Sequence, residues 1–380
     1  MEWTRQLEAL KVNLLGVWEH LHQHPEVSWH EHQTTQFLAD KLQALGLRVQ
    51  TFPDKPGLIG EWGPETGPVV ALRSDMDALW QEVNGVWQGN HSCGHDGHMV
   101  TVLGAVQLLK QAFPSPTIRY RVLFQPAEEV GEGAAFMVQQ GAVDDVSYLF
   151  GLHLRPIQEL RKGQMAAAIH NGAASPLRGT ITGVDSHGAR PHLGMNAIEV
   201  AFAALQAVTA IHLNPMVPYS AKMTQISAGG QSTNIIPGKA EFSFDLRAQT
   251  NETMDVLMEQ TEARIRAVCA VYGVEVKLQW GARSMAARVG LKAREVLAQA
   301  ITDCFGADVL TADVVTPGAE DFHFYTVMRP QLQATMLGLG CDLSPGLHHP
   351  HMAFTKEALF DGMVVLADAA MKAGELLVNA

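Results

Sequence analysis

Eight consecutive residues, from His91 to His98, hold a high density of side chains that can bind metal ions. The segment reads His-Ser-Cys-Gly-His-Asp-Gly-His, so it contains three histidines, one cysteine and one aspartate. Cys93 and His95 are two positions apart, and in an extended or irregular segment they point to the same side. A thiolate and an imidazole together suit a borderline-soft divalent ion. The alternative is a polar loop that leads into the next helix and carries these residue types by chance.

A pair of adjacent glutamates, Glu128 and Glu129, follows residues 118–124, which alternate as a strand. Neighbouring side chains diverge, so one carboxylate can bind a metal ion while the other reaches the water that is to be activated. The alternative is an exposed acidic pair at the start of the next helix, where carboxylates favour the positive end of the helix dipole. The buried strand ahead of the pair and the glycines at 131 and 133 favour the catalytic interpretation.

Other polar side chains come directly after runs that are typical of buried strands. Asp75 and Asp77 follow the apolar run 69–73, and His153 follows 146–150. Functional groups are common at the carboxyl ends of buried parallel strands. Each aspartate either caps a turn or orients a metal-bound imidazole. His153 is either a satisfied core residue or a ligand, and its place at the shared edge of the sheet favours the ligand.

The elements that must position these residues indicate two domains, because 380 residues exceed one ordinary core. Residues 1–171 and 283–380 are predicted to form one α/β catalytic domain, with a mixed, mostly parallel sheet flanked by helices. Residues 172–282 follow the order β-α-β-β-α-β, which predicts an inserted α+β ferredoxin-like domain. Helical periodicity covers residues 3–24, 31–45, 99–112, 196–212, 252–272 and 287–304.

Charge and hydropathy exclude several classes of partner. The net charge of −12 argues against binding to nucleic acid or to an anionic membrane surface. An apolar run of 18 residues and an N-terminal signal region are both absent from the sequence, so a cytoplasmic, non-membrane protein is expected.

The remaining cysteines and histidines are assigned no metal site. Cys269, Cys304 and Cys341 are scattered and are predicted to be buried apolar fillers. Five histidines between His20 and His32 surround a predicted helix end and a proline, without a nearby thiolate or carboxylate pair. A structural or surface role is predicted for them.

Several motifs together resemble the amidohydrolase branch of the aminoacylase/carboxypeptidase dinuclear metallopeptidase family, which includes hippurate hydrolases and plant auxin-conjugate hydrolases. They come in the order and approximate spacing of that family and extend over essentially the whole chain. The motifs are His-Ser-Cys-Gly-His-Asp-Gly-His at 91–98, Gln-Pro-Ala-Glu-Glu at 125–129, Gly-Leu-His at 151–153 and Leu-His-His-Pro at 347–350. Further landmarks lie at 73–79, 232–237 and 319–322.

The resemblance implies two divalent metal ions per chain, Mn²⁺ or Zn²⁺, with Ni²⁺ and Co²⁺ as further options. Cys93 would bridge the two ions, and the other ligands would be His95, Glu129, His153 and His348. His349 stands where a small polar residue is common in the family. The Leu-His-x-Pro register therefore favours His348 over His349 as the ligand.

The resemblance also implies roles for catalytic and substrate-binding residues. Glu128 would be the general base and acid, and Asp75 would be the carboxylate that supports the ligands. The inserted domain would be a lid or dimerisation domain, and its His187 would stabilise the developing oxyanion, often across a dimer interface in relatives. Asn234 and Arg247 would hold the substrate, with Arg247 as a bidentate partner for a free carboxylate.

The sequence departs from the family pattern near two of these positions. Residues 185–188 read Asp-Ser-His-Gly, where the family commonly has Gly-Gly-His-Ala, so His192 is an alternative to His187. Trp80 stands where relatives usually carry proline, which can reshape the pocket wall.

The predicted function is metal-dependent hydrolysis of the amide bond of an N-acyl amino acid or a related small conjugate, with the inserted domain as a candidate homodimer interface. One alternative is a thiol hydrolase with Cys93 as nucleophile and His95 as base. It leaves Glu128 and Glu129 without a role. The other alternative is a non-catalytic protein that binds metal or acyl amino acids, and such a protein has no need of a base at position 128.

Overall fold

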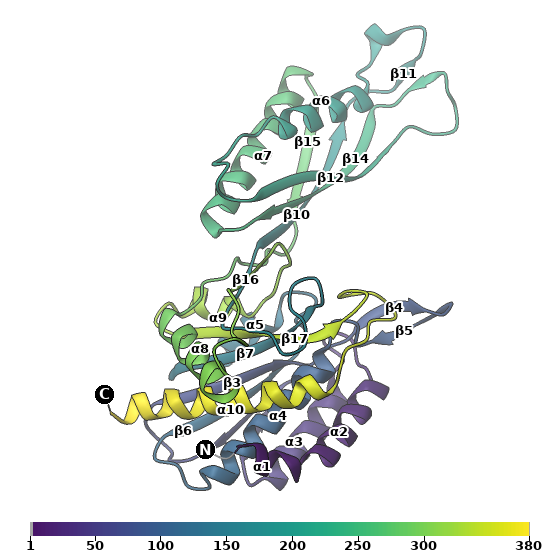
Figure 1. Cartoon of the computed structure of the whole chain (residues 1–380). Helices are drawn as coiled ribbons and strands as arrows, with labels where there is room; N and C mark the ends of the chain where they lie inside the picture. Colours follow the sequence, from purple (N-terminus) through teal and green to yellow (C-terminus); the bar gives the residue numbers. More distant parts are fainter. Residues whose placement is uncertain (1–2, 380) are drawn as a thin grey trace. The chain divides into compact units, whose positions relative to one another are not determined.

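The structure is a computed structural model that describes residues 3–379 (Figure 1). The chain forms two compact units. The first holds the chain through His170, then Arg288–Val315, then the chain from Asp321 onward; the second holds Asn171–Ala287 and Thr316–Glu320. Residues just beyond 282 stay with the second unit because Ser284 pairs with Ala174 and Ala287 N–H donates to Asn171 O at 2.8 Å.

A seven-stranded sheet forms the centre of the first unit, in the order β1-β2-β6-β3-β7-β17-β8. The inner strands β6, β3, β7 and β17 run parallel to one another, and β1, β2 and β8 join antiparallel. This confirms the predicted mixed, mostly parallel sheet. The bounds are β1 (Arg48–Thr51), β2 (Leu58–Trp62), β3 (Val69–Asp75), β6 (Arg119–Gln125), β7 (Val146–Pro156), β8 (Met165–Ala166) and β17 (Gln333–Leu343).

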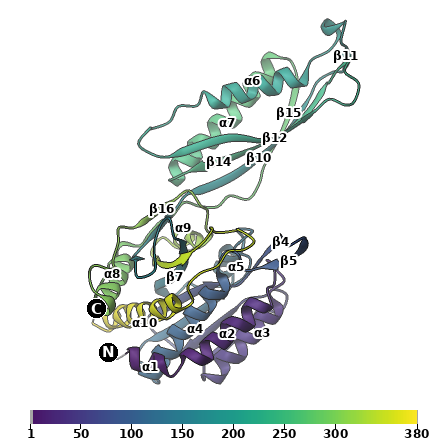
Figure 2. The ribbon, with the colours of Figure 1, turned by 45° about the vertical axis from the view of Figure 1, so that its right-hand side comes forward.

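Helices cover both faces of this sheet because alternate residues of its strands point to opposite sides. Val70 and Leu72 of β3 face a large apolar cluster with α4 and α10, whereas Val69 and Ala71 face a second cluster with α5 and α9. Figure 2 shows α10, α4, α2 and α3 side by side on one face. The helices are α1 (Trp3–Glu8), α2 (Lys11–Gln23), α3 (His32–Ala44), α4 (His95–Ala112), α5 (Gly133–Gln139), α8 (Leu291–Phe305), α9 (His323–Met328) and α10 (Glu357–Val378).

Two elements of the first unit differ from the sequence-based expectation. The expected helix over 3–24 is two helices, α1 and α2, with a break at 9–10. A hairpin of β4 (Leu79–Val83) and β5 (Val86–Asn90) turns at Asn84 and Gly85, which both have positive φ. Asn-Gly is a strong hairpin signal that the sequence reading overlooked. Short strands β9 (Ile169–Asn171) and β16 (Val314–Thr316) also pair with each other.

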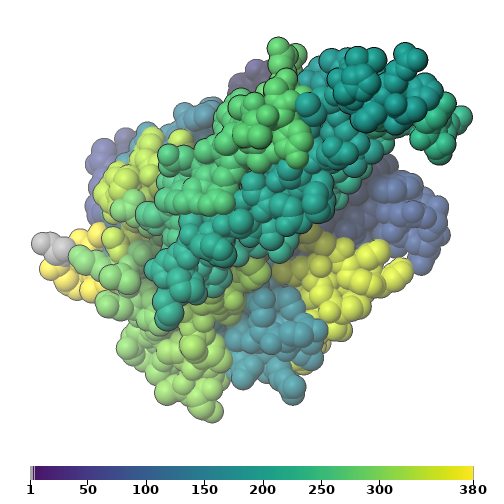
Figure 3. All heavy atoms as spheres, turned by 90° about the horizontal axis from the view of Figure 1, so that it is seen from above, coloured from purple at the N-terminus to yellow at the C-terminus, as the bar shows by residue number. Residues whose placement is uncertain are grey.

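The second unit contains a four-stranded antiparallel sheet in the order β12-β14-β10-β15. Its chain order is β10, α6, β12, β14, α7, β15, which is the ferredoxin-like arrangement expected from the sequence. Figure 3 shows this unit as an elongated body, with the residues of α6 and α7 on its surface. Its elements are β10 (Ala173–Thr182), β11 (Ser186–His187), the short 3₁₀ helix Pro191–Leu193, α6 (Ala197–Thr209), β12 (Tyr219–Ala228), β13 (Ile235–Ile236), β14 (Lys239–Ala248), α7 (Asn251–Val271) and β15 (Glu275–Trp280).

Local sequence explains where the two helices of this unit begin. The Asn196 side chain accepts from Ile198 N–H at the start of α6, and the Thr250 side chain accepts from Thr253 N–H at the start of α7. Alternate residues of β14, such as Phe242, Phe244 and Leu246, are buried against these helices. Across residues 3–379, none of the helices combines the length and the apolar character needed to cross a bilayer.

Candidate metal centre

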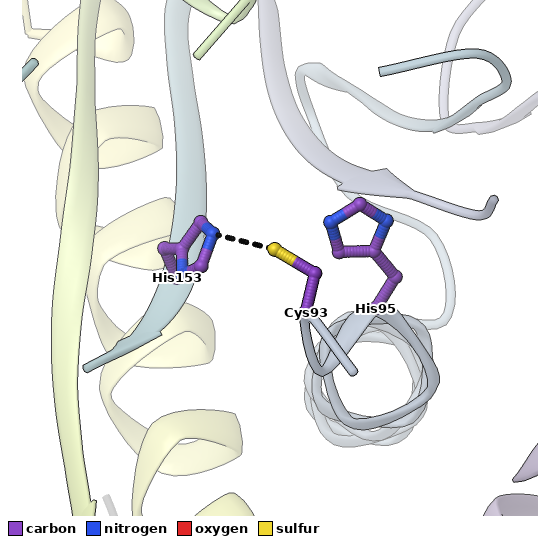
Figure 4. A group of neighbouring side chains, drawn as sticks. All are labelled: Cys93, His95 and His153. Atoms are coloured by element: carbon purple, nitrogen blue, oxygen red, sulfur yellow. Dashed lines mark hydrogen bonds between the residues drawn. The ribbon is translucent and has the colours of Figure 1, made fainter. Parts of the chain in front are cut away.

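Cys93 lies between two histidines at the carboxyl edge of the large sheet (Figure 4). The Cys93 thiol donates to His153 Nε2 of β7, with 3.6 Å between the two atoms. The potential ligand atoms of Cys93, His95 and His153 all lie within 4.8 Å of one another. Gly94 permits this approach, because its φ is +85° and a Cβ there would lie 2.9 Å from Leu154 Cδ1.

A second group of potential ligands shares Cys93. It consists of Cys93, Glu129 and His348, whose ligand atoms also lie within 4.8 Å of one another. His348 Nε2 is 3.5 Å from Glu129 Oε2. Because Cys93 belongs to both groups, its sulfur is placed where one atom can contact two metal ions.

Backbone contacts distinguish His348 from its neighbour His349. His348 N–H donates to Ser92 O at 2.7 Å, which fastens this residue to the segment that carries Cys93. Its φ of +63° turns the chain sharply at this point. His349 stays in its own loop, where its Nδ1 accepts from His351 N–H at 3.1 Å.

The donor atoms of these groups fit divalent metal ions. His95 Nδ1 donates to Asp77 O at 2.8 Å, and His153 Nδ1 donates to Leu154 O at 2.7 Å. Both imidazoles therefore turn Nε2 toward the site, and a metal ion would bind this atom once it has lost any proton. His95 Nε2 and Glu129 Oε1 are buried and have no hydrogen-bond partner within the described part of the chain. Buried polar atoms without partners are uncommon, and a metal ion would satisfy both.

Asp77 holds the turn that carries the two glutamates. Its Oδ1 accepts from Glu128 N–H at 3.1 Å, and its Oδ2 accepts from Glu129 N–H at 3.0 Å. Its backbone carbonyl is also the acceptor for His95. The single residue Asp77 therefore orients one potential ligand and fixes the backbone of both glutamates.

Asp75, which was predicted to be the supporting carboxylate, does not make the same contacts as Asp77. Its Oδ1 accepts from His98 Nδ1 at 2.7 Å, and its Oδ2 accepts from Arg73 Nη1 at 2.6 Å. Its closest approach to His95 Nδ1 is 3.9 Å. In this structure the direct hydrogen bonds to His95 and to the glutamate turn come from Asp77, and Asp75 reaches the site through His98.

Glu128 lies beside the two groups that contain Cys93. Its Oε2 is 3.8 Å from His95 Nε2, and its Oε1 accepts from Asp321 N–H at 3.4 Å. The side chain is largely buried. A carboxylate in this position can receive a proton within the site while Glu129 remains available as a ligand.

Residues 71–372 match the model of Peptidase family M20/M25/M40, which is most of the sequence. This chain belongs to the M20/M25/M40 peptidase family. The predicted resemblance is confirmed, and so is the prediction of a metal-dependent hydrolase; a thiol hydrolase and a non-catalytic binding protein are not favoured.

This chain is similar along nearly its whole length to two curated relatives and to one solved structure. The probable hydrolase sll0100 of Synechocystis is 32% identical, with 97% of this chain and 98% of the relative covered. N-acetyl-L-cysteine deacetylase of Bacillus subtilis is 28% identical, with 96% of this chain and 89% of the relative covered. The crystal structure of Bacillus subtilis YXEP, described as a dinuclear metal binding peptidase from the M20 family, has a TM-score of 0.81 at 25% identity and covers 97% of this chain and 99% of its own.

Burial and neighbouring charges perturb the titratable groups of this M20/M25/M40 site. Burial raises the pKa of the Cys93 thiol well above its ordinary value, and burial also raises the pKa of Glu129 to about 7. Burial lowers the pKa of His95, but Asp75 and then Cys93 outweigh it, so the net shift is upward. Thiols and carboxyls must lose their protons to bind metal, so loading the site with metal releases protons.

A buried network, in which the sequence predicted a role for Asp75 alone, supports the site from the sheet. Arg73 is fully buried and donates to Asp75, to Gln125 Oε1 at 2.8 Å and to Asp321 Oδ1 at 2.9 Å. Gln125 Nε2 donates to both carboxylate oxygens of Asp321. These residues stand within the motifs at 73–79, 125–129 and 319–322, which was the only sequence signal for them.

The three residues predicted to contact substrate from the insertion belong to the second unit. His187 of β11 is exposed and pairs with Ile235 of β13, and Gly188 N–H donates to Asn234 O at 2.7 Å, so His187 and Asn234 are neighbours. Arg247 of β14 pairs with Asp245, with Nε 3.0 Å from Oδ2. It lines a pocket of about 220 Å³ that also includes Tyr219. The roles of these residues stay predictions.

Proposed function

We propose that this chain hydrolyses the amide bond of N-acyl amino acids or related small conjugates, with two divalent metal ions held by Cys93, His95, Glu129, His153 and His348. The observation that carries the proposal is the sharing of Cys93 between two ligand groups directly beside Glu128. The Bacillus subtilis relative named as an N-acetyl-L-cysteine deacetylase supports a small N-acyl amino acid as the substrate.

Two divalent ions, Mn²⁺ or Zn²⁺ in this proposal, polarise an amide carbonyl and lower the pKa of water when bound. Glu128 accepts the proton of the attacking water and later donates it to the leaving nitrogen. Asp321 N–H donates to Glu128 Oε1 and helps to hold the carboxylate in place. A general base of this kind contributes on the order of 10²–10⁴ in rate. Asp77 accepts from the backbone N–H groups of Glu128 and Glu129 and so holds the turn that carries them.

The second unit supplies the proposed contacts to the substrate. Arg247 would bind a free α-carboxylate through its guanidinium, in exchange for its present partner Asp245. Asn234 would hold the substrate, and His187 would donate to the oxyanion that forms at the acyl carbon.

The experiment is a panel of N-acyl amino acids with matched α-amides, assayed for release of the free amine with chelated protein reloaded with Mn²⁺ or Zn²⁺. Wild-type protein should hydrolyse the N-acyl amino acids only after metal is restored. Arg247→Ala should lower kcat/KM by about 10–100-fold for substrates with a free carboxylate, since the lost pair is charge-assisted, and should change the α-amides little.

Full activity in the chelated protein would refute the metal-dependent reaction. Equal losses on both substrate series would remove Arg247 from carboxylate binding while leaving the metal centre untouched. Lys222→Ala is the matched control, because Lys222 is a cation on the neighbouring strand β12 that does not line the Arg247 pocket.

We also propose a homodimer that forms through the second unit. Strand β12 lies at the edge of the four-stranded sheet, where an unpaired strand can pair with another chain. The same unit exposes apolar side chains, Ile226 on β12 and Ile198 and Phe202 on α6. Sedimentation equilibrium should then give twice the chain mass of 41.3 kDa. Phe202→Glu should lower the measured mass toward that of one chain. A monomeric wild type would contradict the proposed homodimer.

A further inference from the structure

The segment between α2 and α3 reaches the turn that carries the two glutamates, here called the catalytic turn (residues 127–133). Ser28 Oγ donates to Asp77 Oδ2 at 2.6 Å, which supports the carboxylate that holds this turn. Trp29 Nε1 donates to Glu132 Oε2 at 2.8 Å. Glu31 Oε1 accepts from Ala127 N–H at 2.7 Å. Two of these side chains thus contact the catalytic turn directly, and the third contacts the aspartate that holds it.

Glu31 is the innermost of the three. Its side chain is 0% exposed, and its second oxygen, Oε2, has no hydrogen-bond partner within residues 3–379. Burial, together with the nearby charge of Asp77, raises the pKa of Glu31 to about 8. Burying a carboxyl group is unfavourable unless its contacts compensate. The Ala127 amide is the contact that links this residue to the rest of the site.

Ala127 occupies a backbone conformation that residues other than glycine rarely adopt. Its φ is +56°, in the left-handed region. Its carbonyl accepts from Gly133 N–H at 3.2 Å, so the turn closes on this residue. At Gly133 a Cβ would lie 1.7 Å from Pro126 O, so the turn has no room to relax there. Glu128 is the next residue, so the direction of its side chain depends on the backbone conformation of Ala127.

We propose that Glu31 is a positioning residue for the general base, because its carboxyl oxygen holds the Ala127 amide and keeps the left-handed turn in the form that aims Glu128 into the metal centre. This inference rests on the proposed role of Glu128. Glu31 acts through the backbone and does not touch the substrate or the metal ions.

The test uses metal-loaded protein and an N-acyl amino acid that the wild type hydrolyses. Glu31→Met fills the buried space without an acceptor, and kcat should fall by about 10–100-fold, with KM and bound metal nearly unchanged. Glu31→Gln keeps an acceptor oxygen and should stay close to the wild-type kcat. Adding Ala127→Gly to Glu31→Met should restore part of the lost kcat, because glycine adopts positive φ without support.

Glu26→Ala is the matched control from the same segment. The Glu26 carboxylate accepts from Thr34 N–H and Thr34 Oγ1 at the start of α3 and does not touch the catalytic turn. It should lower the unfolding temperature and leave kcat unchanged. Equal kcat in wild type and Glu31→Met overturns the proposal, as does a loss that accompanies loss of metal or that Ala127→Gly does not relieve.

Two further outcomes keep the test decisive. If Glu31→Met does not fold, a folded, metal-loaded Glu31→Gln with kcat about tenfold below the wild type or lower overturns the proposal. If Glu128→Gln is as active as the wild type, the proposed base itself is wrong. An inactive Glu128→Gln beside a fully active Glu31→Met refutes only the role of Glu31.

Discussion

Glu128→Gln is expected to remove turnover and leave the metal centre in place. The amide has the shape of the carboxylate and can still accept from Asp321 N–H, but it cannot take a proton from water. Loss of a general base lowers kcat by about 10²–10⁴-fold. Glu128 is absent from both ligand groups that contain Cys93, so two ions per chain should remain. Initial rates and metal analysis of the same sample measure both quantities.

The matched control for this prediction is Glu82→Gln, a change of the same kind on the exposed β4–β5 hairpin. It should retain wild-type kcat and wild-type metal content. A Glu128→Gln protein that turns over at the wild-type rate would assign the proton transfer to another group. If the variant loses metal as well as activity, Glu128 is a ligand rather than the base.

Cys93→Ala is expected to empty both metal positions and, with them, to abolish activity. Its sulfur belongs to the group with His95 and His153 and to the group with Glu129 and His348. Losing a residue that merely supports a ligand weakens metal binding by about 10–100-fold, and losing a shared ligand should weaken it more. Metal analysis after dialysis against Mn²⁺ or Zn²⁺, followed by an assay with excess metal, measures the effect.

Cys304→Ala is the control for general effects of cysteine replacement, because Cys304 is half-buried on α8 and stands in no ligand group of the described chain. It should keep two ions and full activity. Retention of two ions by Cys93→Ala would show that the other four side chains suffice and that the sulfur is not shared.

The chemistry of the site was predictable from sequence where it is local. Cys93 and His95 stand two residues apart at the start of α4, and Glu128 and Glu129 directly follow β6. Such groups depend on short-range geometry, which residue type and strand position are enough to predict. The convergence of His153 and His348 depends on parallel strands that end at one edge of the sheet.

Other features depend on contacts that leave no local pattern. The sequence could not decide between Asp75 and Asp77, because β3 ends at Asp75 and the alternation of its side chains stops there. Glu31 reaches Ala127 across 96 positions of the chain, and only the folded backbone brings them together. The only side-chain role predicted for the region around Glu31 concerned its histidines, of which His22 pairs with Asp96 at 2.7 Å.

The C-terminal helix α10 was missed for a different reason. Between Glu357 and Val378 most side chains are buried, because α10 is packed against α4, α8 and β17. Polar residues at 357, 361, 368, 372 and 375 nevertheless recur at helical spacing, so a narrow polar stripe was a signal that the sequence-based expectation overlooked. The antiparallel ferredoxin-like unit was simpler to predict, since strands such as β14 alternate buried and exposed residues.

A crystal structure of the Mn²⁺- or Zn²⁺-loaded protein, with the metals located by anomalous scattering, measures the metal centre itself. Two peaks should lie about 3.5–4 Å apart. Cys93 Sγ should contact both, and His95, Glu129, His153 and His348 should complete their coordination. A single peak, or two peaks with His153 and His348 directed away from Cys93, would contradict the two-ion centre.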